Sequence, residues 1–201
     1  MRVRTLAACA LALLASAGAG AGEVVGRVTL GVEGARLADL GPTVVFLESL
    51  DGPGAAPPAN RAVLRQRNAR FEPEFLIVVA GQIVRVANDD TIFHNVFSFS
   101  RPNDFDLGVY PAGESRSVTF AHPGLVKVYC SIHESMNATV LVTPSPLYGS
   151  ASATGDYRIA SVPAGRYRLT AWNERLPAVT RVLSVGAGAL RADVALGSDS
   201  P

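Results

Sequence analysis

The chain has 201 residues, 48% of them hydrophobic, with 18 basic and 17 acidic residues and a formal net charge of +1. This balance shows no electrostatic footprint for binding nucleic acids or anionic membranes. The length allows one large or two small domains, each with a substantial hydrophobic core.

Residues 1–21, "MRVRTLAACALALLASAGAGA", predict a secretory signal peptide. Arg2 and Arg4 form its basic start, Leu6–Ala15 its apolar middle and Ala19–Ala21 its small-residue exit. The apolar run is too short to anchor the chain in a bilayer, and no later run reaches membrane-spanning length. We therefore expect a periplasmic or secreted protein without a membrane span.

Apolar and polar residues alternate along nearly every stretch that follows the leader. The pattern is clearest in "VRVAN", "LVKVYC", "RYRLTAW" and "LRADVAL". A period of two is typical of half-buried antiparallel strands, and no segment of a dozen residues shows a helical stripe. The sequence therefore predicts an all-β protein, with "LRADVAL" as one of its strands.

Two shifts in composition predict the domain boundaries. The stretches "DGPGAAPPAN" and "TPSPLYGSASATGD" are rich in Pro, Gly, Ser and Ala and are typical of linkers or long loops. We expect an N-terminal β segment with a linker at residues 22–60, a central domain at residues 61–143 and a β module at residues 144–201. Residues 22–50 either extend the central sandwich or begin the C-terminal module.

The segment "VYCSIHESM" gathers residue types that are scarce elsewhere in the chain. Cys130, His133 and Met136 stand three residues apart, and His94 follows another predicted strand in "VANDDTIFHNVFSFS". Because strand ends meet at the poles of a sandwich, His94 is expected close to this loop. Two imidazoles, a thiolate and a weak axial thioether form the ligand set of blue-copper sites, whereas zinc rarely binds a thioether. The pattern favours copper.

Residues 71–142 resemble a cupredoxin, the fold of plastocyanin, azurin and amicyanin. The resemblance rests on "FEPEFLIVVAGQIVRVANDD", on the "HN" pair, on "FAHPGLVKVYC" and on "CSIHESM", whose short spacing is that of the amicyanin loop. It implies a Greek-key sandwich in which Asn95 braces the site by hydrogen bonds around the thiolate. The ligands that it implies for one type-1 copper ion are His94, Cys130, His133 and Met136.

The same resemblance implies an electron carrier that docks a redox partner protein near His133. A non-redox protein that stores, delivers or senses copper, or an envelope scaffold, would need the same ligands and stays open. We expect no enzyme. A Cys–His nucleophilic pair needs an orienting third group and an oxyanion site, which the sequence does not suggest. Asp89 and Asp90 belong to a turn and do not form a glycosidase pair.

The tail "TGDYRIASVPAGRYRLTAWNE" resembles transthyretin-like or carboxypeptidase-regulatory modules. This resemblance implies a second, smaller β-sandwich and says nothing about its chemistry. Trp172, the only tryptophan, either caps the core of that module or faces the central domain. We favour the core, because large aromatic side chains are mostly buried.

Four arginines crowd the stretch "NRAVLRQRNAR", at positions 61, 65, 67 and 70. In an extended strand Arg65 and Arg67 share one face, which could dock an acidic partner. Charges on a strand more often mark a solvated sheet edge, where they discourage aggregation. We therefore expect an edge strand here.

Overall fold

The computed structural model describes residues 20–32 and 34–198. Their regular structure consists of β-strands and one 3-10 helix, η1 (Leu37–Leu40). The predicted all-β class is therefore confirmed. Nearly all of the predicted signal peptide, residues 1–21, lies outside the described residues. Within them, no helix has the length and apolar character needed to cross a membrane.

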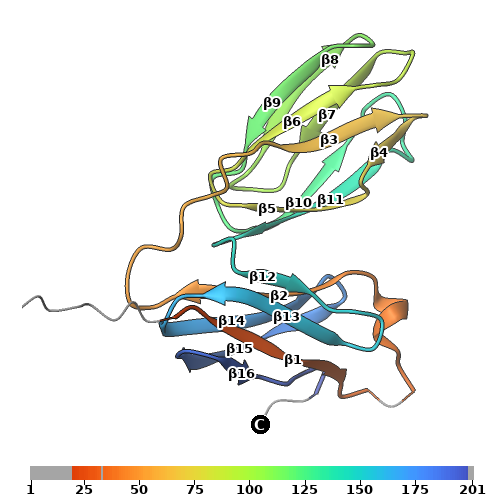
Figure 1. Ribbon diagram of the computed structural model, residues 1–201. Helices are drawn as coiled ribbons and strands as arrows, with labels where there is room; N and C mark the ends of the chain where they lie inside the picture. The colour runs from red at the N-terminus through yellow and green to blue at the C-terminus, as the bar shows by residue number, and fades with distance from the viewer. Residues whose placement is uncertain (1–19, 33, 199–201) are drawn as a thin grey trace, which may run out of the picture.

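The middle of the chain forms a sandwich of two sheets, the upper body in Figure 1. Its strands are β3 (Ala62–Arg67), β4 (Arg70–Glu72), β5 (Phe75–Val79), β6 (Ile83–Asn88), β7 (His94–Ser98), β8 (Phe105–Tyr110), β9 (Ser115–Thr119), β10 (Gly124–Tyr129) and β11 (Asn137–Thr143). One sheet has the order β4-β3-β6-β9 and the other the order β5-β11-β10-β7-β8. The chain thus crosses repeatedly between the sheets, as in Greek-key sandwiches.

The period-two alternation explains why these two sheets pack together. Val84 and Val86 of β6 are buried, and Val126 and Val128 of β10 are buried opposite them in the same core cluster. Burial of each such side chain stabilises the fold by about 1.5–3 kcal/mol. The core thereby fixes the ends of β6, β7 and β10, from which the loops of the candidate site start.

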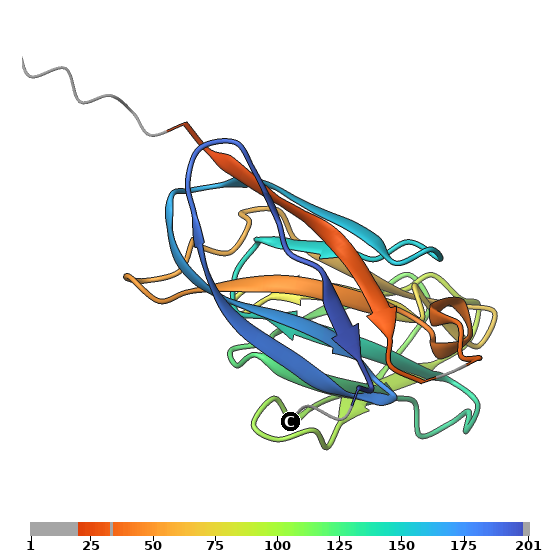
Figure 2. The ribbon, with the colours of Figure 1, turned by 90° about the horizontal axis from the view of Figure 1, so that it is seen from below.

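A second body is built from both ends of the chain. Its strands are β1 (Gly22–Leu30), β2 (Thr43–Ser49), β12 (Tyr148–Ser150), β13 (Asp156–Val162), β14 (Gly165–Asn173), β15 (Leu176–Val185), β16 (Ala189–Arg191) and β17 (Val194–Leu196). One sheet has the order β12-β2-β14-β15, and β1 pairs with β13, β16 and β17. Figure 2 shows β1 beside strands from the far end of the chain. A separate core cluster fills this body, whose likeness to transthyretin-like modules stays a prediction.

The stretch "LRADVAL" is not the single strand that its alternation predicts. It forms β16 and β17, which pair in parallel with successive parts of β1. Between them, Ala192 and Asp193 belong to no strand: the Ala192 N–H donates to the Val25 carbonyl at 2.8 Å, and the Asp193 carboxylate accepts from the Arg27 N–H at 2.8 Å. A side-chain contact that replaces strand pairing is not visible in the alternation.

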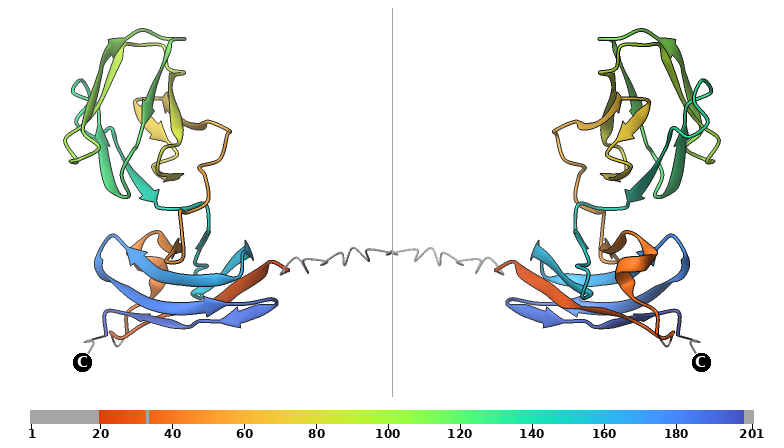
Figure 3. Two further views of the ribbon diagram at one scale, coloured as in Figure 1. Left: turned by 90° about the vertical axis from the view of Figure 1, so that its left-hand side faces the viewer. Right: turned by 90° about the vertical axis from the view of Figure 1, so that its right-hand side faces the viewer.

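The two bodies touch and are joined by two chain segments (Figure 3). At the contact, the rings of Phe75 and Trp172 stack with centroids 6.0 Å apart, and Lys127 forms an ion pair with Glu174. The expectation that Trp172 lies in a core is therefore wrong. On β14 the inward positions are Ala171 and Asn173, which are buried, so the residue between them faces outward.

Because Trp172 is the only tryptophan, its fluorescence reports on this contact. Phe75→Ala removes the stacked ring, worth about 0.5–1.5 kcal/mol, and lets water reach the indole. We expect a red-shifted emission maximum with an unchanged far-UV circular dichroism spectrum. Phe99→Ala is the control, since Phe99 is 80% exposed and packs on Phe97. An unshifted spectrum in the Phe75 variant would contradict the stacked contact.

Candidate metal centre

His94 is held by the loop between β6 and β7. The Asn88 side chain shapes this loop: its amide N–H donates to the Ile92 carbonyl at 2.9 Å, and its oxygen accepts from the Asp90 N–H at 3.1 Å. His94 then begins β7 with its side chain fully buried. Its Nδ1 faces Cys130, and its Nε2 faces Asp90.

The other predicted ligands lie on the loop from Cys130 to Met136, between β10 and β11. Backbone hydrogen bonds close it tightly: the Cys130 N–H donates to the Met136 carbonyl at 3.2 Å, and the Met136 N–H donates to the His133 carbonyl at 3.0 Å. The Asn95 side chain ties this loop to β7, because its oxygen accepts from the Ser131 N–H at 2.8 Å. The two ligand-bearing segments are therefore fixed to one another.

Three of the predicted residues converge at this pole of the sandwich. The Cys130 Sγ lies 3.8 Å from His94 Nδ1 and 4.0 Å from His133 Nδ1. One ligand atom from each of the three residues lies within 4.8 Å of the others, and the imidazole centroids are 4.9 Å apart. The cluster can hold a metal ion between one sulfur and two nitrogens.

The remaining predicted residues lie near the same cluster with different exposure. Met136 is buried and belongs to the core cluster that contains Cys130, which is only 5% exposed. His133 is half-buried. Asn95 makes its hydrogen bond to Ser131, the residue after the thiol, and its amide N–H donates to the Asp106 carboxylate at 3.2 Å.

Asp90 is a site residue that the sequence analysis missed, because it was assigned only to a turn. Its Oδ2 lies 3.0 Å from His94 Nε2 and accepts from the Ala69 N–H at 2.8 Å. The Ala69 N–H outweighs burial and, with the Thr91 N–H and His94, lowers the pKa of Asp90 to about 2. The carboxylate therefore stays ionised down to acid pH. The spacing of four residues between Asp90 and His94 was the signal in the sequence from which this contact could have been predicted.

A buried polar pair lies in the core of the same sandwich. Gln66 Nε2 donates to the Tyr110 hydroxyl at 2.5 Å, and Tyr110 pairs with His94 across β7 and β8. Burial raises the pKa of Tyr110 to about 12, so its hydroxyl stays protonated at neutral pH. Gln66 Oε1 is buried without a hydrogen-bond partner among the described residues.

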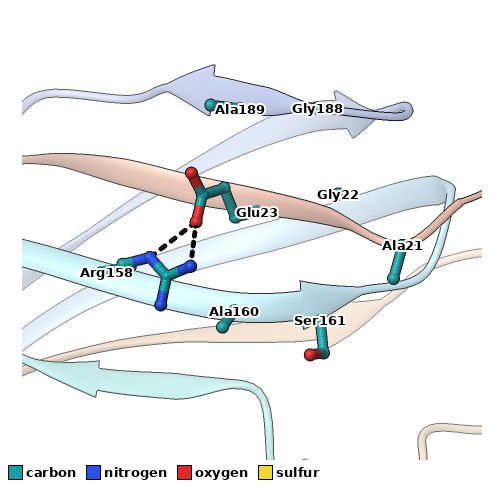
Figure 4. A pocket seen from close by; sticks show the side chains of 8 residues that line it. All are labelled: Ala21, Gly22, Glu23, Arg158, Ala160, Ser161, Gly188 and Ala189. Carbon is teal, nitrogen blue, oxygen red and sulfur yellow. Dashed lines mark hydrogen bonds and ion pairs between the residues drawn. The ribbon is translucent and has the colours of Figure 1, made fainter.

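A surface hollow on the second body offers no comparable chemistry. It lies where β1 begins and is crossed by the ion pair between Glu23 and Arg158, 2.5 Å apart (Figure 4). Its other lining residues are small: Ala21, Gly22, Ala160, Ser161, Gly188 and Ala189. Among the residues that the structure describes, the only metal-ligating cluster of histidine, cysteine and carboxylate groups is that of His94, Cys130 and His133.

The Asp90–His94 contact predicts a loss of metal affinity when the carboxylate is removed. Outer carboxylates fix the ring and tautomer of a ligating histidine, and their loss typically costs 10–100-fold in affinity. We expect that range for Asp90→Ala in a competitive copper titration. Asp89→Ala is the matched control, because Asp89 pairs with Arg65 instead. Equal affinities for the two variants would rule out the positioning role of Asp90.

The sequence matches no known protein family and no curated protein. Solved structures resemble part of it. A purple cupredoxin from Nitrosopumilus maritimus is 24% identical, with a TM-score of 0.38, and the match covers 41% of this chain and 99% of that chain. The reduced state of an amicyanin mutant is 22% identical, with a TM-score of 0.38, and the match covers 49% of this chain and 99% of that chain.

A copper-containing nitrite reductase from Thermus scotoductus SA-01 is 21% identical, with a TM-score of 0.41. That match covers 48% of this chain, which spans 25% of the enzyme. Solved cupredoxins are thus similar to this chain over less than half of its residues.

Proposed function

We propose that this chain is an exported copper protein that carries single electrons. The observation that supports it most strongly is the convergence of one thiol and two imidazoles at a sandwich pole, with the thiol buried. The proposed ligands of one type-1 copper ion are His94, Cys130, His133 and Met136. We propose a carrier and not an enzyme.

The donor set fits copper in both chemistry and spacing. Cysteine, two histidines and a weak methionine suit copper better than zinc. Ligand atoms about 2.0–2.3 Å from one ion, at angles near 120°, lie roughly 3.5–3.8 Å apart. The distances from Cys130 Sγ to the two Nδ1 atoms, 3.8 and 4.0 Å, are close to this range. When bound, copper supplies one-electron exchange between its two oxidation states.

The residues of the chain hold the site rigid and nearly dry. His94 and Cys130 are buried, which keeps water from two of the proposed ligands. The Asn95–Ser131 and Asp90–His94 contacts hold the side chains in place before any metal arrives. A preorganised site needs little rearrangement in either oxidation state. His133 is half-buried and is the most exposed of the four proposed ligands, and we place the redox partner there.

We also propose a division into domains. Residues 61–143 would form the copper domain, inserted into a second domain made of residues 22–50 and 144–198. Separate core clusters and strand pairing within each part support this division. Insertion is tolerated where the ends of the inserted domain lie close together. The predicted signal peptide supports export to the periplasm or beyond.

Copper binding is tested by colour. The mature protein should bind one Cu(II) ion with an intense blue thiolate band, and Cys130→Ser should lose the band while its far-UV circular dichroism is unchanged. Ser131→Ala is the control, because only the backbone N–H of Ser131 contacts Asn95. A Cys130→Ser variant that stays blue would contradict the ligand assignment. A colourless protein that binds only Cu(I) would support copper storage or delivery.

Electron exchange is tested at the rim of the site. Ile132 precedes His133 and is 49% exposed. Ile132→Glu should slow electron self-exchange between two copies by about tenfold or more, because like charges would meet at the rim. The blue band should not change. Val182→Glu, at a residue 58% exposed on the second body, is the control. Equal rates, measured by NMR line broadening, would contradict docking at His133.

A further inference from the structure

Arg65 and Arg67 of β3 do not lie on a sheet edge, contrary to the expectation from the sequence, whereas Arg70 lies on the edge strand β4. β3 lies between β4 and β6, and its inward residues are the buried Leu64 and Gln66. The outward residues therefore join those of the neighbouring strands on one sheet surface. We call this surface the arginine face; its cations are Arg65 and Arg67 of β3, Arg70 of β4 and Arg85 of β6.

Most cations of the arginine face have no acidic partner. Arg65 pairs with Asp89, but within the described part of the chain no ion pair involves Arg67, Arg70 or Arg85. In the second body the side chains of Arg175 and Arg181 donate only to backbone carbonyls of the described residues, and the paired arginines are Arg27, Arg36, Arg158, Arg166, Arg168 and Arg191. Arg67, Arg70 and Arg85 thus form a group of three cations without ion pairs to the residues that the structure describes, on one surface, which also carries the carboxylate of Glu72.

The arginine face is continuous with the candidate metal centre. Arg67 and Arg70 flank the turn between β3 and β4, in which the Ala69 N–H binds Asp90, the partner of His94. Arg70 also borders a surface hollow with Ser135, a residue of the ligand loop. A molecule seated on this end of the face would touch the loops that surround the metal centre.

The apolar residues of the arginine face distinguish a protein partner from a polyanion. Val63 pairs with Arg85 across β3 and β6, and Ile83, 40% exposed, lies two residues from Arg85. Arginine mixed with apolar groups is typical of protein interfaces, and a guanidinium group binds a carboxylate through two parallel hydrogen bonds. Purely electrostatic binding of lipid or nucleic acid needs no such apolar contacts.

We propose that the arginine face docks an acidic protein surface and brings that partner to the metal centre. The identification of the partner as a redox protein rests on the proposed function; the docking of an acidic surface does not. Charge complementarity of this kind mainly raises the association rate and orients the encounter, while the apolar rim at Ile132 supplies the close contact.

The docking face is tested on the full mature chain without added copper. A glutamate-rich peptide is titrated into labelled protein, and amide NMR shifts are mapped. We expect shifts confined to β3, β4 and β6, lost in Arg67→Glu and kept in Arg101→Glu, which reverses an exposed charge after the far end of β7. Shifts elsewhere, or equal shifts in both variants, would overturn the proposal. So would Arg67-dependent binding to phosphatidylglycerol vesicles without binding of the peptide.

A second measurement uses the copper-loaded protein and hexacyanoferrate, an anionic redox probe. Arg67→Glu should slow the exchange several-fold at low salt relative to Arg101→Glu, and the difference should shrink as salt screens the field. Electron exchange without this difference would overturn the docking face and leave the carrier function intact. Peptide binding at the face in a protein that exchanges no electrons would refute the carrier function alone.

Discussion

A buried imidazole has two ring nitrogens, and each needs a partner if burial is not to cost free energy. The candidate metal centre is organised around this requirement at His94. One nitrogen faces the Cys130 thiol and the other faces Asp90. The carboxylate needs donors in turn and receives them from Ala69 and Thr91. The side chains of His94 and Asp90 thereby connect the β6–β7 loop to the β3–β4 turn and to Cys130, the residue after β10.

This arrangement has a local cost in the backbone. Asn68 and Ala69 both have φ of +52°, a conformation that residues with a Cβ rarely adopt. Such a residue costs on the order of 1–2 kcal/mol. The hydrogen bond from the Ala69 N–H to a charged carboxylate contributes about 1.5–3 kcal/mol, which offsets the strain at Ala69. The β3–β4 turn therefore both stabilises Asp90 and is stabilised by it.

The sequence predicted those features that depend on neighbours along the chain. Alternation placed Val126, Val128 and Cys130 on one inward face, and the spacing to His133 is a property of one short loop. The spacing of Asp90 to His94 was visible in the sequence, but the contact that holds Asp90 could not be predicted, because it depends on a left-handed turn about twenty residues away. The prediction for Trp172 was wrong for a similar reason. Alternation indicates that its side chain faces outward, but its contact with Phe75 depends on the neighbouring body.

The connectivity of the two bodies has a consequence for the order in which the chain folds. β2 pairs with β12 and β14, yet roughly 100 residues separate β2 from β12. Closing a flexible loop of that length costs about 4 kcal/mol of chain entropy. Once the intervening sandwich has formed, its ends at β3 and β11 are fixed, and the effective loop shrinks to residues 50–61 and 144–147. Assembly of the outer strands is thus favoured after the central sandwich has formed.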